Sequence, residues 1–514
     1  MKRTLASALG VAALGVLTFV PTAAQVAQEA VDLDVVERIR DEGLDRSQIP
    51  ELAGHLTDVI GPRLTNSPGI WRAQEWLTAT FDAWGLENIE VEPWGEFGRG
   101  WENVELTFRA LTPYPQPLSA WPTAWTGSTE GTVRGPAVIV EAETPEDLEA
   151  YRGKLAGAFV LMRPYEWIEP DWEPRERRQA LDWLLEPPVE REQPEMTEEQ
   201  RAERERMIAE WRARRALMAQ VAEMVADEGA AAILSPSGWT GNLLRMGGTR
   251  AYQADEPIPG PQLVLSHEDY GQIWRNVKRG VPMELELNVQ NRWYDDDLQG
   301  KNVLADLPGT DLADEYIMIG GHYDSWHAGT GAADNAAGTV VMMEALRILK
   351  ELGLQPRRTI RIALWSGEEQ GLYGSRMWVE NHPELHDRIS AYLNFDNGTG
   401  RIRGIYNQMN EGVTPIFEQL LWPFRDLGVV AVKHANTGGT DHLAFDGAGI
   451  PGFQFIQDPI EYSVNTHHSN IDTYERLVMD DLKQAAVVVA SLVYHLANRD
   501  EMLPRKPMET MSQR

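Results

Sequence analysis

The stretches YIMIGGHYD (residues 316–324) and TIRIALW (residues 359–365) are short apolar runs, typical of strands buried in a sheet. Between them, DNAAGTVVMMEALRILKELG (334–353) spaces its apolar residues as a helix does. Further strand-like runs alternate with helical segments downstream of 302, namely NVLADL (302–307), ISAYLNFD (389–396), VVAVKH (429–434) and GFQFIQ (452–457). This alternation predicts an α/β fold with a mostly parallel, mixed sheet flanked by helices.

The sequence upstream of this region has a different texture. Residues 31–87 carry apolar side chains at helical spacing, whereas short apolar runs between Gly and Pro, typical of strands, recur up to residue 298. We therefore expect a main domain in two parts, interrupted by a β-rich insertion. The predicted segments are a signal peptide at 1–24, the main domain at 25–112 and 299–500, the insertion at 113–298 with a charged helical segment at 165–229, and a C-terminal tail at 501–514.

Composition limits the class of protein. The apolar fraction of 43% and the 18 Trp residues suffice for packed cores. There are 47 basic and 78 acidic residues, a formal net charge of −31, which argues against nucleic acid and anionic membranes as partners. The chain has no cysteine, so any metal must be bound by His and carboxylate groups.

The first residues are typical of a signal peptide. Lys2 and Arg3 precede an apolar run from 5 to 20, and small residues at 22–24 form a cleavage site. We expect an exported protein, periplasmic or extracellular, without a membrane anchor after removal of this segment. An uncleaved anchor is the alternative.

Acids and histidines gather where predicted strands end. GGHYD (320–324), WSGEEQ (365–370) and NFDNG (394–398) each end a strand, GAADNAAG (331–338) opens a helix, and NTHHSNIDT (465–473) is a late loop. The carboxyl ends of parallel strands share one edge of a sheet, so these groups can converge. Taken singly, each has an ordinary structural explanation, such as a helix N-cap for Asp334. Together, they would repel and desolvate one another unless cations neutralised them.

These motifs resemble those of the di-zinc exopeptidase family that includes bacterial leucyl aminopeptidases and plasma glutamate carboxypeptidase. The resemblance rests on GGHYDS, ADNAAG, WSGEEQGLYGS, NFDN and HHSNIDT, with GPRLTNSPG (61–69) upstream, and it covers about 30–110 and 300–498. The insertion is similar to the protease-associated domain found in this family. The resemblance implies the zinc-exopeptidase fold.

The resemblance also implies residue roles. His322 and Asp396 would bind one metal, Glu369 and His468 the other, and Asp334 would bridge the two. Two Zn²⁺ per chain are implied, with Mn or Co as alternatives. Glu368 would be the general base that takes a proton from water and returns it to the leaving amine. On an extended chain Glu368 and Glu369 would point in opposite directions, one to the cleft and one to a metal.

Other residues have less definite roles. Asp324, two residues after His322, would orient that imidazole. Many relatives have Tyr where this chain has His467, so His467 or another group would donate to the oxyanion. Asp441 and His442, in a segment similar to one near the substrate in the family, are candidates for the pocket, with packing or turn roles as the alternative. We interpret His327 and His434 as structural.

The sequence thus predicts an exported metallo-exopeptidase for small peptides, with aminopeptidase activity favoured and dipeptidase or carboxypeptidase activity as the alternative. A non-catalytic binding protein on the same fold and a one-metal acyltransferase of the glutaminyl-cyclase kind are the rivals. The complete set of ligands and base argues against both. A homodimer is compatible with the sequence.

Overall fold

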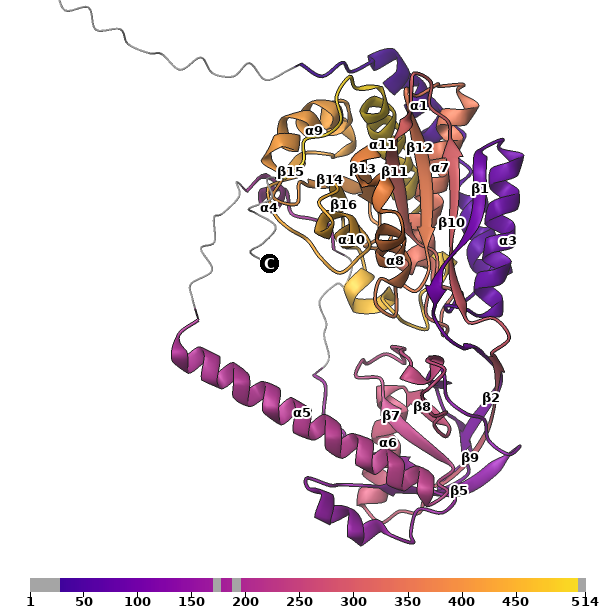
Figure 1. Cartoon of the computed structure of the whole chain (residues 1–514). Helices are drawn as coiled ribbons and strands as arrows, with labels where there is room; N and C mark the ends of the chain where they lie inside the picture. The colour runs from indigo at the N-terminus through magenta and orange to yellow at the C-terminus, as the bar shows by residue number, and fades with distance from the viewer. Residues whose placement is uncertain (1–27, 170–176, 187–195, 507–514) are drawn as a thin grey trace, which may run out of the picture.

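Two eight-stranded sheets form the framework of the chain (Figure 1). The computed structural model describes residues 28–169, 177–186 and 196–506. The expected signal peptide at 1–24 and the last residues of the expected tail, 507–514, lie outside the described residues.

The first sheet is mixed and mostly parallel, as predicted. Its strand order is β1 (Glu87–Glu96), β10 (Gln299–Leu307), β12 (Arg358–Trp365), β11 (Leu312–His322), β13 (Ile389–Asn394), β16 (Gly452–Gln457), β14 (Ile402–Tyr406) and β15 (Ala431–Lys433). The four central strands β12, β11, β13 and β16 are parallel to one another, whereas the pairs β1–β10, β10–β12 and β14–β16 are antiparallel. The parallel centre brings several strand ends to one edge.

Helices cover both faces of this sheet. Ile319 of β11 is opposite Ile362 of β12, and both pack in the larger core, whereas Met318 and Ala363 pack in the core on the opposite face. The larger core is built with α1 (Leu33–Asp45), α2 (Ile49–Gly54), α3 (Pro68–Ala83), α7 (Ala337–Glu351), α9 (Thr414–Leu421) and α11 (Met479–Asn498). The smaller core is covered by α8 (Tyr373–Asn381) and α10 (His442–Gly447).

Short turns of helix, labelled η, connect these elements. We call the first sheet with its helices the first unit, and the second sheet with its helices the second unit. The turns of the first unit are η1 (His55–Ile60), η4 (Ala332–Ala336), η5 (Pro383–Arg388), η6 (Glu411–Val413), η7 (Trp422–Leu427), η8 (Tyr462–Thr466) and η9 (Tyr474–Arg476). Turn η4 carries Asp334, and turn η8 directly precedes His467 and His468.

The second sheet lies below the first in Figure 1. Its order is β3 (Gln116–Pro117), β2 (Gly100–Ala110), β9 (Glu284–Tyr294), β5 (Val133–Ile139), β6 (Phe159–Leu161), β7 (Ala232–Pro236), β8 (Gln262–Leu265) and β4 (Ala120–Pro122). Its helices and turns are η2 (Pro145–Tyr151), α5 (Glu198–Asp227), η3 (Arg250–Tyr252) and α6 (His267–Lys278). This unit already begins with β2 at Gly100, ahead of the expected boundary at 113, because β2 pairs along its length with β9.

The charged segment expected at 165–229 is not one continuous helix in the part that the structure describes. It contains α5 and the short α4 (Leu181–Leu185). Leu184 of α4 packs against Ala431 and Ile456 of the first sheet, and Arg177 forms an antiparallel bridge with Ile460. This part of the segment therefore returns to the main domain, since its apolar residues find a core there.

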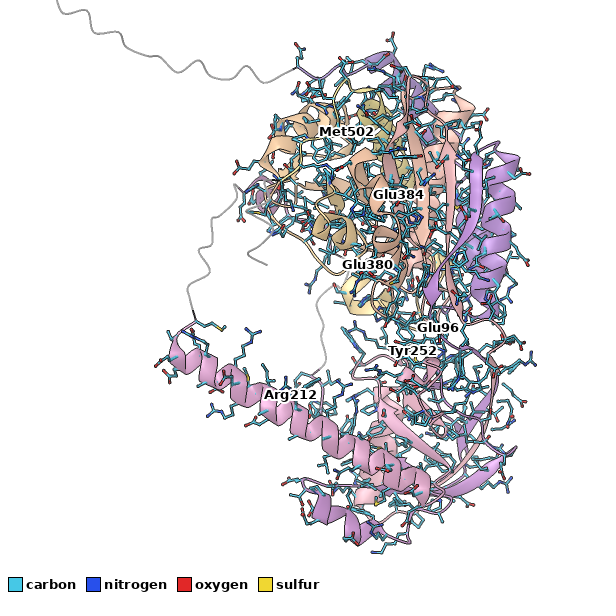
Figure 2. The ribbon with its side chains drawn as sticks, in the orientation of Figure 1. Glu96, Arg212, Tyr252, Glu380, Glu384 and Met502 are labelled. Carbon is cyan, nitrogen blue, oxygen red and sulfur yellow. The ribbon has the colours of Figure 1, made fainter. Side chains whose placement is uncertain are left out.

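An aromatic cluster joins the two units beside the sheet edge. It includes the buried Trp94, Trp101, Trp125 and Tyr252, which come from both units. Figure 2 shows Tyr252 near Glu96 at this junction, with Arg212 well away from it on α5. Across the described ranges, none of the helices has the length and apolar composition needed to cross a bilayer.

Candidate metal centre and active site

His322 occupies the last position of β11 and is almost fully buried. Its Nδ1 lies 3.1 Å from the carbonyl oxygen of Asp324, and its Nε2 lies 3.4 Å from Oδ1 of Asp334 and 3.4 Å from Oδ1 of Asp396. Asp396 follows β13, the parallel neighbour of β11. A proton on Nδ1 donates to the carbonyl, which leaves the lone pair of Nε2 directed at the two acids.

Glu369 and His468 form the other half of the cluster. Oε2 of Glu369 lies 2.8 Å from Nε2 of His468, and the same Nε2 lies 3.5 Å from Oδ2 of Asp334. Oδ1 of Asp334 faces His322, so the two oxygens of one carboxylate face two separate imidazoles. The structure thus brings together all five residues for which the sequence predicts metal ligation.

The turn that carries Asp334 is held by the late loop. The carboxylate of Asp472 accepts the backbone N–H of Ala333 (2.6 Å) and that of Asp334 (3.0 Å), and the hydroxyl of Tyr462 donates to Oδ1 of Asp334 (3.2 Å). Asp334 has φ −128° and ψ 87°, outside the helical range, and it does not cap α7. Its carboxylate is therefore left to the cluster.

The two adjacent glutamates do not lie on extended chain, as the sequence had suggested. β12 ends at Trp365, and Glu368 and Glu369 lie in a turn that follows Gly367, whose φ is +72°. Their carboxylates nevertheless diverge, because Oε2 of Glu368 lies 3.9 Å from Nε2 of His322 while Glu369 meets His468. A tight turn, rather than strand alternation, separates them.

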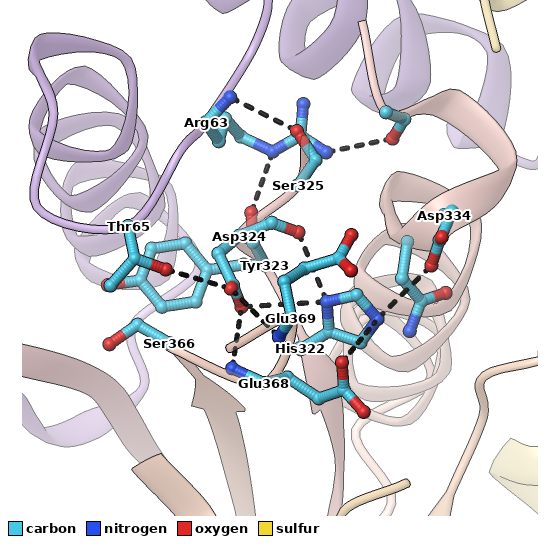
Figure 3. Close-up of polar contacts among 12 residues, drawn as sticks. Arg63, Thr65, His322, Tyr323, Asp324, Ser325, Asp334, Ser366, Glu368 and Glu369 are labelled. Atoms are coloured by element: carbon cyan, nitrogen blue, oxygen red, sulfur yellow. Dashed lines mark hydrogen bonds and ion pairs between the residues drawn. The ribbon is translucent and has the colours of Figure 1, made fainter. Parts of the chain in front are cut away.

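Asp324 lies at the centre of the supporting hydrogen bonds (Figure 3). Its Oδ1 lies 3.5 Å from Nδ1 of His322, and its Oδ2 accepts the hydroxyl of Thr65 at 2.9 Å. The backbone N–H groups of Glu368 and Glu369 each approach this carboxylate at 3.4 Å. Asp324 therefore orients both the imidazole and the glutamate turn, a larger role than the sequence predicts.

Arg63 is a supporting residue that sequence reasoning missed. It is fully buried and donates to the carbonyl oxygens of Tyr323 (2.7 Å), Thr330 (2.8 Å) and Gly331 (2.8 Å), which flank the site (Figure 3). Burial lowers its pKa to about 10. Arg63 lies in GPRLTNSPG (61–69), a segment on which the family resemblance rests, but no feature of that segment indicated a role for the arginine.

Several buried carboxylate oxygens of the cluster have no hydrogen-bond donor in the part of the chain that the structure describes. Among the described residues, Oδ2 of Asp334, Oε1 of Glu369 and Oδ1 of Asp396 are buried and accept no hydrogen bond. Burial raises the pKa of Glu369 well above its usual range, and the carboxylate of Asp334 adds to the shift. Two groups of donors, His322 with Asp334 and Asp396, and Asp334 with His467 and His468, are close enough to hold metal ions. The oxygen and nitrogen donors fit divalent metals.

Glu368 has the surroundings of a tuned acid–base group. Burial raises its pKa well above the usual value, and the carboxylates of Asp396 and Asp441 contribute in the same direction. Asp441 itself is fully buried next to α10, and burial raises its pKa to about 7. A nearby cation would lower both pKa values by stabilising the carboxylates.

His467 lies at the rim of the cluster. Its Nε2 lies 4.0 Å from Oδ2 of Asp334, its ring centroid lies 3.7 Å from that of His468, and its Nδ1 lies 2.6 Å from Nη2 of Arg245. Burial lowers its pKa to about 4. Arg245 comes from the second unit, and no sequence signal connected it to the site.

The remaining histidines make structural contacts. Nε2 of His442 lies 3.1 Å from the carbonyl oxygen of Thr437, and Nε2 of His327 lies 2.8 Å from that of Pro122. Nδ1 of His434 lies 3.0 Å from Nδ2 of Asn407. Each of these three imidazoles therefore has at least one hydrogen-bond partner away from the metal centre.

Comparison with known proteins adds to this geometry. Residues 302–493 match the model of peptidase family M28. Carboxypeptidase Q from Mus musculus is 26% identical over 487 residues, which cover 93% of this chain and 91% of the relative. The structure of a peptidase M28 precursor from Shewanella amazonensis SB2B superposes with a TM-score of 0.66, at 23% identity, over 92% of this chain and 98% of that one. BSAP, a zinc aminopeptidase from Bacillus subtilis, gives a TM-score of 0.56 at 17% identity, over 89% and 97%.

The fold matches that of the structural neighbours, and the site gathers nitrogen and oxygen donors able to hold metal ions. The α/β architecture predicted from the sequence is confirmed by the structural neighbours. The chain is similar to peptidase family M28 over residues 302–493, and to carboxypeptidase Q over most of its length.

Proposed function

We propose that this enzyme is an exported two-zinc exopeptidase that cleaves small peptides, and that aminopeptidase action is its main activity. The observation that carries the proposal is the placement of Asp334, whose Oδ1 faces His322 and whose Oδ2 faces His468. One carboxylate shared between two donor groups is the arrangement that a pair of neighbouring cations requires.

The residues divide between the two ions. His322 and Asp396 would hold one zinc, Glu369 and His468 the other, and Asp334 would contact both. When bound, zinc acts as a Lewis acid on the scissile carbonyl and lowers the pKa of water. Asp324, Thr65 and Arg63 keep the donors in place before substrate arrives.

Glu368 is the group that moves the proton. Its carboxylate is buried beside the cluster and is not needed by either set of ligands. Glu368 accepts a proton from the attacking water and delivers it to the amine that leaves. With cations beside it, this carboxylate would be ionised and able to take a proton from water, then return it to the leaving amine.

The test combines metal analysis with turnover. Wild-type protein should contain about two zinc ions per chain. Glu368→Gln should keep both ions but lose nearly all turnover of dipeptides and aminoacyl reporters. Glu380→Gln, the same change at an exposed position on α8, is the matched control and should remain active. A fully active Glu368→Gln enzyme would exclude this base.

Carboxypeptidase or dipeptidase action is the second candidate, because the similarity to carboxypeptidase Q extends over nearly the whole chain. Free, amino-blocked and carboxy-amidated dipeptides separate the two. An aminopeptidase tolerates the amide but not the blocked amine, and a carboxypeptidase shows the opposite preference. A dipeptidase requires both free ends.

Three further expectations belong to the same proposal. The second unit would be a protease-associated domain, the N-terminal segment would direct export to the periplasm or medium, and the enzyme would act alone or as a homodimer on small peptides, not on nucleic acid or membranes. The charge of −31 supports the last point. N-terminal sequencing of the mature protein and its mass in solution test the export and the dimer.

A further inference from the structure

A segment of the second unit pairs with the loop that carries His467 and His468. The backbone N–H of Met246 donates to the carbonyl oxygen of His468 at 2.7 Å, and Arg245 and Ser469 form an antiparallel bridge. Leu244 and Asn470 exchange two further bonds, from N–H of Leu244 to Oδ1 of Asn470 (2.8 Å) and from N–H of Asn470 to the carbonyl oxygen of Leu244 (3.0 Å). The loop is therefore tied at several points to the second unit.

Arg245 extends from this pairing to the rim of the metal centre. Its Nη2 lies 2.6 Å from Nδ1 of His467, and its guanidinium carbon lies 5.6 Å from the ring centroid of Trp239. Stacking on an indole restricts where the guanidinium can be. The direction of the bond to His467 is thus defined by a neighbour from the same unit as Arg245.

The bond determines which nitrogen of His467 carries the proton. A guanidinium has five N–H donors and no acceptor, so Nδ1 of His467 must accept. The proton of the neutral ring is then on Nε2, which lies 4.0 Å from Oδ2 of Asp334 and so faces the cluster. His467 therefore presents an N–H donor to the metal centre, on the side of Asp334.

We propose that Arg245 is a positioning residue that holds His467 as the Nε2–H tautomer, so that His467 can donate to the oxyanion that develops during peptide cleavage. This inference rests on the proposed function. A donor aimed in advance at developing charge lowers the barrier without reorganisation during the reaction. The second unit would then contribute a residue to the active site.

The first experiment observes the tautomer directly, in metal-free protein labelled with ¹⁵N-histidine. The ring nitrogens of His467, assigned by their loss in His467→Phe, should show a protonated Nε2 and an unprotonated Nδ1. In Arg245→Met this preference should be lost, whereas Arg245→Lys, which also only donates, should retain much of it. An unchanged ring spectrum in Arg245→Met would overturn the proposal.

The second experiment measures kinetics on zinc-loaded enzyme. Arg245→Met should lower kcat by about 10²-fold, the scale of one oxyanion donor, with KM within about twofold of wild type. Arg245→Lys should recover part of this loss. Arg245→Met should cost nothing further in a His467→Phe background, because both changes remove the same donor. Arg212→Met, on α5, is the matched control and should match wild type.

Two results would overturn the proposal in different ways. A rise in KM confined to peptides with a free carboxylate, at unchanged kcat, would make Arg245 a substrate-binding residue. Loss of zinc from both the Met and Lys variants would mean that Arg245 only holds the loop of His468. A wild-type enzyme without peptidase activity would instead refute the proposed function, while the tautomer measurement would still test the bond.

Discussion

Oε2 of Glu369 lies 2.8 Å from Nε2 of His468, although one side chain comes from the turn after β12 and the other from the loop after η8. His322 occupies the other half of the cluster with Asp396. Asp334 is the residue common to both halves. The number of metal ions that a substitution releases should therefore depend on whether the residue belongs to one half of the cluster or to both.

Asp334→Asn should release both metals, because the amide removes a negative charge and replaces one of two ligand oxygens by an NH₂ group that cannot coordinate. We expect bound zinc to fall from about two ions per chain to fewer than one after dialysis, measured by elemental analysis. Asp396→Asn, which touches only one half, should retain about one ion. Two tightly bound ions in Asp334→Asn would contradict the bridging role.

Removal of metal should destabilise the folded chain, because buried carboxylate oxygens of Asp334, Glu369 and Asp396 would lose their counter-charge. Binding at 100 times Kd contributes about 2.7 kcal/mol per site, so a chelator should lower Tm by several degrees. Calorimetry with and without chelator measures the shift. The shift should nearly vanish in Asp334→Asn and return in wild type on adding zinc, and an equal shift in both proteins would rule out this explanation.

Asp324→Asn should weaken zinc binding or activity by about 10–100-fold, the usual scale for residues that orient a ligating imidazole. The carboxylate also faces the N–H groups of Glu368 and Glu369, so the glutamate turn should loosen as well. Zinc titration and turnover provide the measurement. Asp314→Asn, at an exposed position on β11, the strand that precedes Asp324, should behave as wild type. If Asp324→Asn also matched wild type, Asp324 would not be the residue that orients His322.

His327 should make stability depend on pH at the junction of the two units. Burial lowers its pKa to about 4 from an ordinary 6.5, so between these values the unfolded chain binds more protons than the folded one. The contribution is complete above about pH 6.5, is lost as the pH falls towards about 4, and amounts to about 3 kcal/mol.

Urea unfolding of His327→Gln tests this dependence, because the amide can still donate to the carbonyl of Pro122 but does not titrate. The difference between about pH 5 and about pH 7 should be smaller in the variant than in wild type. Parallel pH dependences of the two proteins would show that His327 does not contribute.

The candidate ligands could be predicted because their signal is local. His322, Glu369 and Asp396 each end or follow an apolar strand of a parallel sheet, and strand ends meet at one edge. The turn at Glu368 was missed because a glycine with positive φ ends the strand early, and an apolar run does not reveal where extended chain stops. Arg63 and Arg245 were missed because a buried or stacked arginine has no periodic signature.

The sequence by itself determined the alternation of strands and helices, the candidate metal-binding residues, and the excess of acid that argues against nucleic-acid partners. Only the tertiary structure decided the strand order, the sharing of Asp334 between two imidazoles, and the approach of Arg245 to His467 from another unit. The physical reason is range: periodicity and composition act between near neighbours in the chain, whereas pairing of distant strands and loops depends on which surfaces pack together once both cores have formed.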